Sequence, residues 1–318
     1  MYSRINRPDW ARLIAIAANE VKDEVGEGAV ADYIPALANV DPNQFALSLS
    51  LVDGRTFHTG ATGTRFSIQS ISKVFTLTTA LNYAGGNLWD VVGREPSGTG
   101  FNSIVQLERE NGIPRNPFIN AGAIVTTDQL VSSCENEDPI DKLLALVKDA
   151  TSDRNIGIDG EVARSEREWG ARNRSLAYFM KSFGVMTNDI ETVLWTYFQQ
   201  CAIAMTTSQL SRAGLFLAAN GVDPVSGNVI TTADRVARIN ALMLTCGHYD
   251  MSGDFAFRVG IPGKSGVGGG ILAIVPGLGS FAVWSPALNK FGNSHAGTLA
   301  LEILSHEAGL SVFLDPSR

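Results

Sequence analysis

The chain has 318 residues, 45% of them hydrophobic and 18% charged, and its formal net charge at pH 7 is −7. This length and composition allow a large buried core, organised as one large domain or as two smaller, interleaved ones. The acidic balance argues against nucleic acid or an anionic membrane as a partner, and the sequence has no cluster of lysine and arginine that would contradict this.

The number and spacing of the cysteines and histidines indicate the cellular compartment and show whether a metal site is expected. The three cysteines, Cys134, Cys201 and Cys246, are odd in number and widely spaced, which favours a reducing compartment over a disulfide scaffold. Neither they nor the four histidines show the spacing of metal ligands. The N-terminus lacks the pattern of a signal peptide, and no apolar run is long enough to span a membrane. We therefore expect a cytoplasmic protein that needs no metal or organic cofactor.

The first elements predicted along the chain are a helix and a hairpin. Residues 8–25 show apolar positions with helical spacing. Residues 45–51 alternate between apolar and small residues, Asp53-Gly54 is a turn signal, and residues 56–59 form the expected return strand.

From about residue 70 to residue 250 the sequence is mainly helical, with loops rich in Gly, Pro, Asn and Asp between the helices. The predicted helices span residues 72–84, 121–134, 139–149, 174–183, 188–199, 206–219 and 232–246.

The C-terminal part returns to strand patterns. Short apolar runs bounded by glycine and proline predict strands over 255–261, 270–275 and 281–284, and a final helix is predicted over 295–308. If the hairpin pairs with these strands, the two ends of the chain form one antiparallel sheet, with the helical block inserted beside it. We therefore expect an α/β (α+β) fold with two subdomains in one domain. The sheet subdomain would comprise residues 1–66 and 255–318, and the helical subdomain residues 67–254.

Ser70 and Lys73 form a Ser-x-x-Lys pair at the predicted start of the helix over 72–84. This spacing places both side chains on one helical face, so that the amine can reach the hydroxyl. A serine hydroxyl is a poor nucleophile until a neighbouring base takes its proton, and a neutral lysine can act as that base. About one such pair arises by chance in a chain of this length, so its weight depends on the other motifs.

Lys73 can act as a base near neutral pH only if its pKa falls by a few units from about 10.4. Burial at the positive end of a helix, with Lys264 as a possible second cation, would lower the pKa in this way.

Lys264 belongs to a glycine-rich stretch, residues 260–270, that contains Lys-Ser-Gly. Small residues there would let a backbone approach a ligand closely, although a flexible hairpin turn explains them equally well. The spacing of a phosphate-binding loop is absent. A Ser-x-x-Lys pair followed about 190 residues later by Lys-Ser-Gly is the order found in penicillin-recognising serine enzymes.

Six segments together carry a more specific signal. They are SIQSISKVF (67–75), NPFINAGAI (116–124), SEREWGARN (165–173), YFQQC (197–201), CGHYD (246–250) and GIPGKSGVGGG (260–270). In composition and order they resemble the serine-dependent glutaminases, which have the β-lactamase-like fold. The resemblance extends from about Val30 to the last predicted strand.

The resemblance implies hydrolysis of L-glutamine to L-glutamate and ammonia through an acyl-enzyme, in a homo-oligomer (a dimer or tetramer). Ser70 matches the nucleophile and Lys73 its base, and Tyr33 and Tyr249 match active-site tyrosines, either of which could relay a proton. The positions that match substrate-binding residues of the family are Ser70, Asn120, Glu166, Asn173, Tyr197, Tyr249 and Val267.

The chemistry of the reaction agrees with these roles. The oxyanion needs donors, for which the backbone N–H groups of Ser70 and Val267 are suited. The ammonium group of glutamine needs an acceptor, which Glu166 would supply. The carboxylate needs donors, and the side chains of Asn120, Asn173 and Tyr197 would supply them.

Taken singly, these residues also have ordinary structural explanations. Glu166 lies in a charge-rich run that would by itself be a solvated face, and Lys264 suits solvation at a sheet edge as well as it suits a site. Asn120 could simply cap a helix. Only the joint pattern favours the site.

Two other functions are alternatives. A β-lactamase or DD-peptidase would need export, and no convincing Ser-x-Asn or Tyr-x-Asn motif is present. A non-catalytic amino-acid sensor would have no need of Ser70, Lys73 and Tyr249 together.

Overall fold

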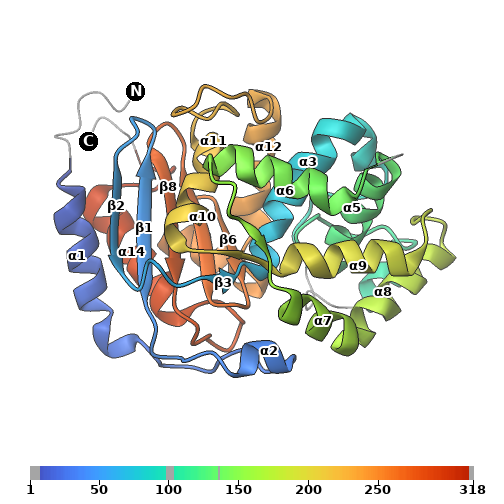
Figure 1. Ribbon diagram of the computed structural model, residues 1–318, viewed down its shortest axis with the longest axis horizontal. Helices are drawn as coiled ribbons and strands as arrows, with labels where there is room; N and C mark the ends of the chain where they lie inside the picture. Colours follow the sequence, from blue (N-terminus) through green and yellow to red (C-terminus); the bar gives the residue numbers. More distant parts are fainter. Residues whose placement is uncertain (1–7, 98–103, 135–136, 315–318) are drawn as a thin grey trace.

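The computed structural model describes residues 8–97, 104–134 and 137–314. Figure 1 shows a sheet with helices against it on the left and a block of helices on the right. The strands are β1 (Ala46–Leu51), β2 (Thr56–Gly60), β3 (Phe66–Ser67), β4 (Gly157–Ile158), β5 (Ile203–Met205), β6 (Gly263–Gly266), β7 (Gly270–Val275) and β8 (Gly279–Trp284).

The helices account for most of the rest of the chain. The α-helices are α1 (Trp10–Glu20), α2 (Pro35–Ala38), α3 (Ser72–Ala84), α4 (Ile104–Arg109), α5 (Asn120–Ser132), α6 (Pro139–Thr151), α7 (Gly160–Trp169), α8 (Ala171–Ser182), α9 (Ile190–Cys201), α10 (Thr207–Ala213), α11 (Leu215–Ala218), α12 (Ala233–Cys246), α13 (Ser252–Arg258) and α14 (His295–Ala308). The 3-10 helices among the described residues are η1 (Lys22–Glu24), η2 (Gln69–Ile71), η3 (Gly85–Asp90) and η4 (Tyr249–Met251).

Strands from the two ends of the chain form one antiparallel sheet in the order β2-β1-β8-β7-β6. The predicted hairpin supplies β1 and β2, and the C-terminal part supplies the other three strands. Gly54 in the hairpin turn has φ +88°, a conformation that glycine adopts far more readily than other residues. The predicted antiparallel sheet is confirmed.

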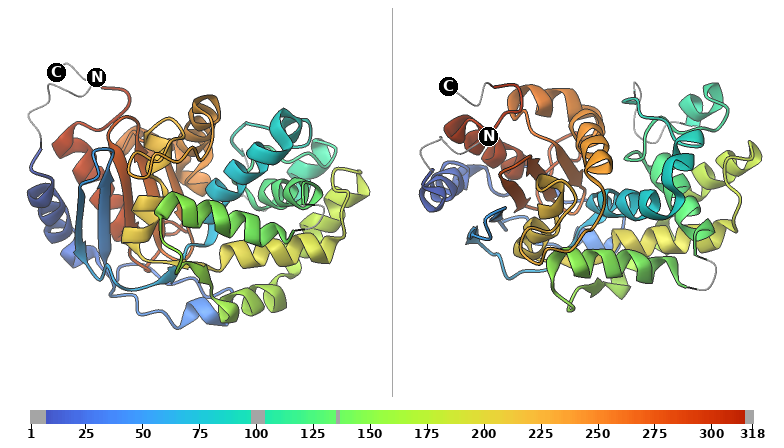
Figure 2. Two further views of the ribbon diagram at one scale, coloured as in Figure 1. Left: turned by 45° about the horizontal axis from the view of Figure 1, so that its top comes forward. Right: turned by 90° about the horizontal axis from the view of Figure 1, so that it is seen from above.

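The two faces of β1 explain how the sheet is covered. Leu49 and its alternate neighbours pack with α1 and α14 in one apolar cluster. The opposite face carries Ser48 and Ser50, which form 2.9 Å hydroxyl–hydroxyl hydrogen bonds with Thr207 and Ser211 of α10. Because successive side chains of a strand point to opposite faces, the alternation in the sequence determines which helices cover which side. Figure 2 shows helices on both faces.

α3 is the central helix of the helical block. It is buried from Ser72 to Leu81, since α5, α6, α9 and α12 all pack around it, and a helix surrounded in this way shows no polar face. Just before it, β3 pairs with β5, and β5 pairs with β4, in a small second sheet. The start of α3 is therefore held between the two parts of the molecule.

The strand predicted over 255–261 is wrong, because α13 occupies most of this segment. Phe255, Phe257 and Val259 alternate as in a strand, yet Phe255 and Val259 are 1% exposed and Phe257 is 91% exposed. Burial at i and i+4 but not at i+2 is the helical pattern. The third C-terminal strand is instead β6, whose Gly-Lys-Ser-Gly sequence has no strand preference of its own and is fixed by pairing with β7.

Other differences are smaller. The helix predicted over 206–219 is divided at Gly214, where a Cβ atom would lie 2.4 Å from the Ser280 hydroxyl oxygen. The first helix is shorter than predicted, and α4 and α7 lie in segments for which the sequence predicts no helix. The final helix has the predicted bounds, with the Ser294 side chain as its N-cap and Gly309 at φ +62° as its end.

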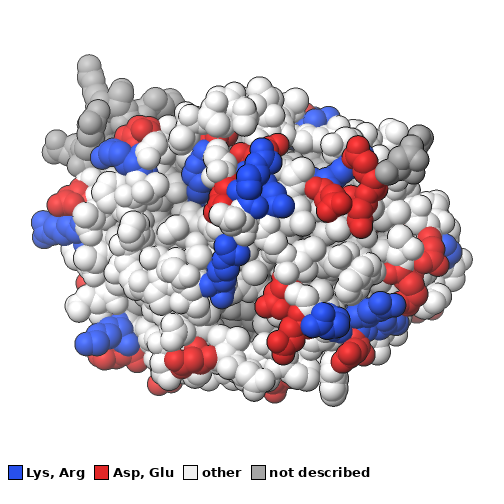
Figure 3. All heavy atoms as spheres, viewed as in Figure 1, with Lys and Arg blue, Asp and Glu red and all other residues white. Residues whose placement is uncertain are grey.

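The distribution of charged side chains on the surface agrees with the acidic net charge of the sequence. On the face seen in Figure 3, the acidic and basic side chains of the described residues are interspersed and do not gather in a basic patch. No helix within the described ranges is long and apolar enough to cross a membrane.

Candidate active site

A pocket of about 340 Å³ lies between the helical block and the edge of the sheet, and we call it the Ser70 pocket. Its described lining residues are Tyr33, Gln69, Ser70, Asn120, Glu166, Trp169, Gly170, Arg172, Asn173, Tyr197, Cys201, Tyr249 and Val267.

Ser70 and Lys73 lie at the junction of η2 and α3. The Lys73 side chain is 1% exposed, and its amine donates to the Phe118 carbonyl oxygen (3.2 Å) and to Asn120 Oδ1 (2.7 Å). Burial lowers the pKa of Lys73 to about 8, although the negative charge of Glu166 acts in the opposite direction. The neutral form that a general base requires is therefore far more populated near physiological pH than in an ordinary lysine, although the protonated form still predominates.

Tyr249 approaches Ser70 from the end of α12. Its φ of +53° lies in the left-handed region, which is uncommon for a residue other than glycine and is often found at functional sites. Burial raises the pKa of Tyr249, while hydrogen bonds with the Ser70 side chain and the Val267 backbone act against this rise. The phenol therefore stays protonated at neutral pH, next to both Ser70 and Val267.

Close backbone contact brings Val267 to the start of α3. A Cβ atom on Gly266 would lie 2.6 Å from the Ile68 carbonyl oxygen, and one on Gly268 would lie 2.5 Å from that of Ser67. Only glycine permits this approach. The glycines of the 260–270 stretch thus let the backbone of Val267 reach the Ser70 pocket.

Glu166 is a buried carboxylate on the inner side of α7, only 3% exposed. Tyr33 donates a 2.6 Å hydrogen bond to its Oε1 atom. Burial raises the pKa of Glu166, and the hydrogen bonds from Tyr33 and Gln69 and the charge of Lys73 act against this rise. The interpretation of Glu166 as part of a solvated face is therefore wrong, although most of its neighbours on α7 are exposed.

A line of polar side chains continues from Lys73 along the wall of the pocket. Asn120 accepts from the Lys73 amine through Oδ1 and donates through Nδ2 to Asn173 Oδ1 (3.1 Å). Tyr197 of α9 is 3% exposed, and the centre of its ring lies 6.0 Å from the Lys73 amine. These groups offer amide and phenol donors around one small volume.

Comparisons with known proteins decide the family. The sequence model of the family described as Glutaminase matches residues 28–313. The chain belongs to the glutaminase family. A curated glutaminase from Rhizobium rhizogenes is 57% identical over 296 residues, which are 93% of this chain and 96% of the relative.

Solved structures of glutaminases have the same fold. The structure of the probable glutaminase ybaS has a TM-score of 0.89 and 37% identity, covering 96% of this chain and 99% of that one. A probable glutaminase from Bacillus subtilis, solved in complex with 6-diazo-5-oxo-L-norleucine, has a TM-score of 0.86 and 31% identity, covering 98% of this chain and 100% of that one. The predicted β-lactamase-like fold is confirmed.

All residues that the glutaminase resemblance singled out lie together in this structure. Eight of them line the Ser70 pocket, and Lys73 contacts it through Asn120. The residues that sequence reasoning missed are Gln69, Trp169, Gly170, Arg172 and Cys201. Gln69 could have been suspected, since it precedes Ser70 within one of the matching segments, but its φ of +48° and its contact with Tyr33 appear only in the structure.

Lys264 lies behind the Ser70 pocket and does not line it. The side chain is fully buried (0% exposed), so its interpretation as a solvated residue at the sheet edge is wrong. The amine of Lys264 lies 4.7 Å from the centre of the Tyr249 ring.

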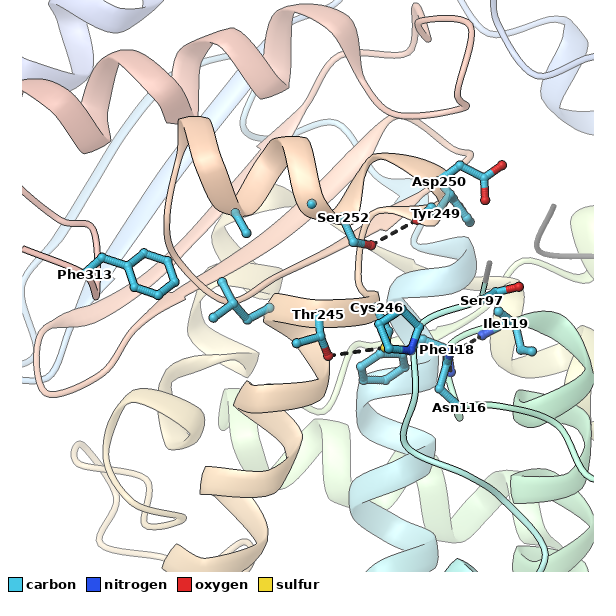
Figure 4. A pocket seen from close by; sticks show the side chains of 14 residues that line it. Ser97, Asn116, Phe118, Ile119, Thr245, Cys246, Tyr249, Asp250, Ser252 and Phe313 are labelled. Atoms are coloured by element: carbon cyan, nitrogen blue, oxygen red, sulfur yellow. Dashed lines mark hydrogen bonds between the residues drawn. The ribbon is translucent and has the colours of Figure 1, made fainter. Parts of the chain in front are cut away.

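A second pocket of about 410 Å³ shares Tyr249 with the Ser70 pocket, and Figure 4 shows the side chains that line it. It is lined largely by apolar side chains such as Phe118, Ile119 and Phe313. Among the described residues that line it, Asp250 is the only one with a formal charge at neutral pH. Its walls offer no counterpart to the pair of Ser70 and Lys73.

Within the described part of the chain, no group of three or more His, Cys, Asp or Glu side chains is arranged to hold a metal ion.

Proposed function

We propose that this member of the glutaminase family hydrolyses L-glutamine to L-glutamate and ammonia, with Ser70 as the nucleophile. The observation that carries the proposal is the buried Lys73, whose pKa is lowered to about 8 beside the pocket that Ser70 lines. An activated serine next to donors for an oxyanion is the arrangement that acyl transfer needs.

Acylation follows from the positions of three groups. Neutral Lys73 takes the proton of the Ser70 hydroxyl, and Oγ forms a bond to the carbonyl carbon of the γ-carboxamide. The resulting oxyanion accepts hydrogen bonds from the backbone N–H groups of Ser70 and Val267. As the C–N bond breaks, the nitrogen takes a proton and leaves as ammonia, and the Tyr249 phenol next to Ser70 can relay that proton from Lys73.

Deacylation repeats these roles with water. Lys73 takes a proton from a water molecule, whose oxygen attacks the glutamyl ester, and the bond between Ser70 and the acyl carbon breaks. The Ser70 oxygen takes the proton back, and glutamate leaves.

The rest of the pocket suits a free α-amino acid. Buried Glu166 would accept the ammonium group of glutamine, and Tyr33 would hold that carboxylate in place. Asn120, Asn173 and Tyr197 would bind the α-carboxylate through neutral donors.

Ammonia release tests the proposal directly. We expect wild type to release ammonia from glutamine and Ser70→Ala to release essentially none. Ser72→Ala, two residues further along the same segment and also buried, serves as the matched control and should keep activity within about threefold. Full activity in Ser70→Ala would overturn the mechanism. Turnover of nitrocefin would favour a β-lactamase, and glutamine binding without turnover would favour a sensor.

A second test identifies the nucleophile. A diazoketone alkylates a nucleophilic oxygen with loss of N₂, and the Bacillus subtilis relative was solved with such a compound, 6-diazo-5-oxo-L-norleucine. We expect this compound to add covalently to Ser70 of wild type and not to Ser70→Ala, as measured by mass spectrometry of the intact protein and its peptides. Labelling of another residue would contradict the role of Ser70.

We also propose that residues 1–66 with 255–318 and residues 67–254 act as one catalytic domain, in a cytoplasmic homo-oligomer that is a dimer or tetramer. The pocket takes Glu166 from the helical part and Val267 from the sheet part, which supports a single functional unit. Exposed aromatic side chains on and just after α8, Tyr178 (57%) and Phe183 (44%), support an oligomer. Light scattering coupled to gel filtration would measure the subunit number.

A further inference from the structure

The backbone at Tyr249 has a conformation that tyrosine does not favour by itself. Its φ is +53°, and a residue other than glycine stays in this left-handed region only where its surroundings fix it. The reaction as proposed depends on this conformation, because the Tyr249 phenol is hydrogen-bonded to the Ser70 side chain and the Val267 backbone. Some group in the structure must therefore hold the backbone.

The hydroxyl of Ser252 bonds to the backbone on both sides of this position. It accepts from the His248 N–H (3.0 Å) and donates to the Tyr249 carbonyl oxygen (3.0 Å), and Figure 4 shows the bond to Tyr249. The two bonded groups enclose the φ and ψ torsions of His248 and Tyr249, so one hydroxyl restrains all four. Ser252 is only 7% exposed, so water competes little for either bond.

The helix that Ser252 begins does not explain these bonds. A serine hydroxyl at the start of a helix commonly accepts from a backbone N–H group further along the helix. The Ser252 hydroxyl instead accepts from a residue four positions earlier, and α13 has Met251 as an N-cap without a side-chain hydrogen bond. Ser252 therefore stabilises the segment before the helix.

Other contacts hold the surroundings of Tyr249. The His248 carbonyl oxygen accepts from the Met251 N–H (3.0 Å) and from Asn293 Nδ2 (3.3 Å). A Cβ atom on Gly292 would lie 3.9 Å from the Tyr249 ring, in ordinary contact with it. These contacts act on the carbonyl group before Tyr249 and on the space beside its ring, while Ser252 holds the carbonyl group of Tyr249 itself.

We propose that Ser252 is a positioning residue, whose hydroxyl holds the Tyr249 backbone in the left-handed conformation that directs the phenol to Ser70. The inference rests on the proposed function of the Ser70 pocket. Because the phenol acts on the nitrogen as the C–N bond breaks, a displaced phenol should lower kcat more than it changes KM.

The test uses Ser252→Ala, which removes both hydrogen bonds. We expect kcat for glutamine to fall at least about tenfold, since a misplacement of about 1 Å can cost about 100-fold, with KM within about threefold of wild type. Ser252→Thr keeps the hydroxyl, and its extra methyl group can face the second pocket, which Ser252 lines. It should keep kcat within about threefold. A folded Ser252→Thr protein as slow as Ser252→Ala would overturn the role of the hydroxyl.

Ser305→Ala is the matched control. Ser305 is 2% exposed, and its hydroxyl donates a 2.6 Å hydrogen bond to the Val259 carbonyl oxygen at the other end of α13. Losing this bond should lower Tm about as much as Ser252→Ala does and keep kcat within about threefold. A tenfold loss of kcat in Ser305→Ala would show that kcat follows the stability of α13, and would overturn the inference.

A double-mutant cycle with Tyr249→Phe separates positioning from mere stability. If Ser252 acts through the phenol, Ser252→Ala should cost at least about fivefold less in the Tyr249→Phe background than in wild type. Equal costs in both backgrounds, or a kcat of Ser252→Ala within about threefold of wild type, would overturn the inference. Where Ser252→Ala does not fold, as judged by circular dichroism, the same cycle with Ser252→Cys, which keeps only a weak donor, decides.

The outcome for Ser252 can be told apart from the outcome for the proposed function. A wild-type protein that releases no ammonia from glutamine overturns both. An active wild type with equal costs in the cycle overturns only the role of Ser252.

Discussion

The Tyr33 hydroxyl donates a 2.6 Å hydrogen bond to the Glu166 carboxylate across 133 residues of sequence. The contact arises because α2, which follows Tyr33, packs against α7 through Leu37 and Val162. Water is largely excluded from Glu166, so the hydroxyl of Tyr33 and the amide of Gln69 stabilise its negative charge instead. The binding of an ammonium group that we propose for Glu166 would therefore depend on a residue near the start of the chain.

Tyr33→Phe removes the hydroxyl and keeps the ring. The pKa of Glu166, which burial already raises, then rises further because a hydrogen bond to its charged form is lost. We expect KM for glutamine to rise about three- to tenfold at neutral pH, and more steeply as the pH falls, because a protonated Glu166 attracts the ammonium only weakly. KM measured from about pH 5.5 to about pH 8 tests this. Tyr178→Phe, at an exposed tyrosine of α8, is the control, and a KM equal to wild type throughout would contradict the prediction.

Glu166→Gln removes the charge and keeps the shape. The ammonium of glutamine then enters a pocket without its charged partner, so we expect KM to rise at least about 30-fold, with a smaller effect on kcat. Glu168→Gln is the matched control, because Glu168 is an exposed acid two residues along the same helix. An unchanged KM in Glu166→Gln would mean that another group binds the ammonium.

The pH dependence of kcat/KM should report Lys73. Only the neutral amine can take a proton from Ser70, and burial lowers the pKa of Lys73 to about 8. We therefore expect kcat/KM to rise about tenfold per pH unit below pH 8 and to level off above it. With an ordinary lysine pKa the rise would continue to about pH 10.

Removing the charge of one neighbour checks whether this rise in kcat/KM belongs to Lys73. The negative charge of Glu166 raises the pKa of Lys73, so Glu166→Gln should move the rise to lower pH. A rise that stays in place or moves to higher pH would show that it belongs to another group.

The sequence predicts elements best where the signal is local. The last helix has the predicted bounds because Ser294 and Gly309 mark its ends by their own chemistry. The sheet was predictable from the alternating hairpin near one end of the chain and from the short apolar runs near the other. The location of β6 was not, since the preference of Lys264 and its neighbours for a strand comes only from pairing with β7.

The candidate site was predictable as a set of residues but not as a geometry. The motif spacing brings Ser70 and Lys73 together, yet the burial that lowers the pKa of Lys73 depends on four helices packed around α3. The left-handed conformations of Gln69 and Tyr249 are tertiary features with no local signal. Glu166 was ambiguous because a charged helix does not reveal which of its acids faces inward.

Gly122→Ala should lower both stability and activity, although helix propensity favours alanine at this position in α5 by about 1 kcal/mol. A Cβ atom on Gly122 would lie 1.8 Å from the Asn116 carbonyl oxygen. Asn116 Oδ1 accepts hydrogen bonds from the backbone N–H groups of Phe118 and Ile119 and so holds the turn that presents the Phe118 carbonyl oxygen to Lys73. We expect a loss of about 2–3 kcal/mol in the free energy of unfolding from overpacking and at least about a tenfold loss of kcat, because the partner of Lys73 is displaced. Urea unfolding and ammonia release measure the two effects. Gly157→Ala is the control, since a Cβ atom there meets nothing within 4 Å. A Gly122→Ala protein as stable and as active as wild type would show that the turn can shift without consequence for Lys73.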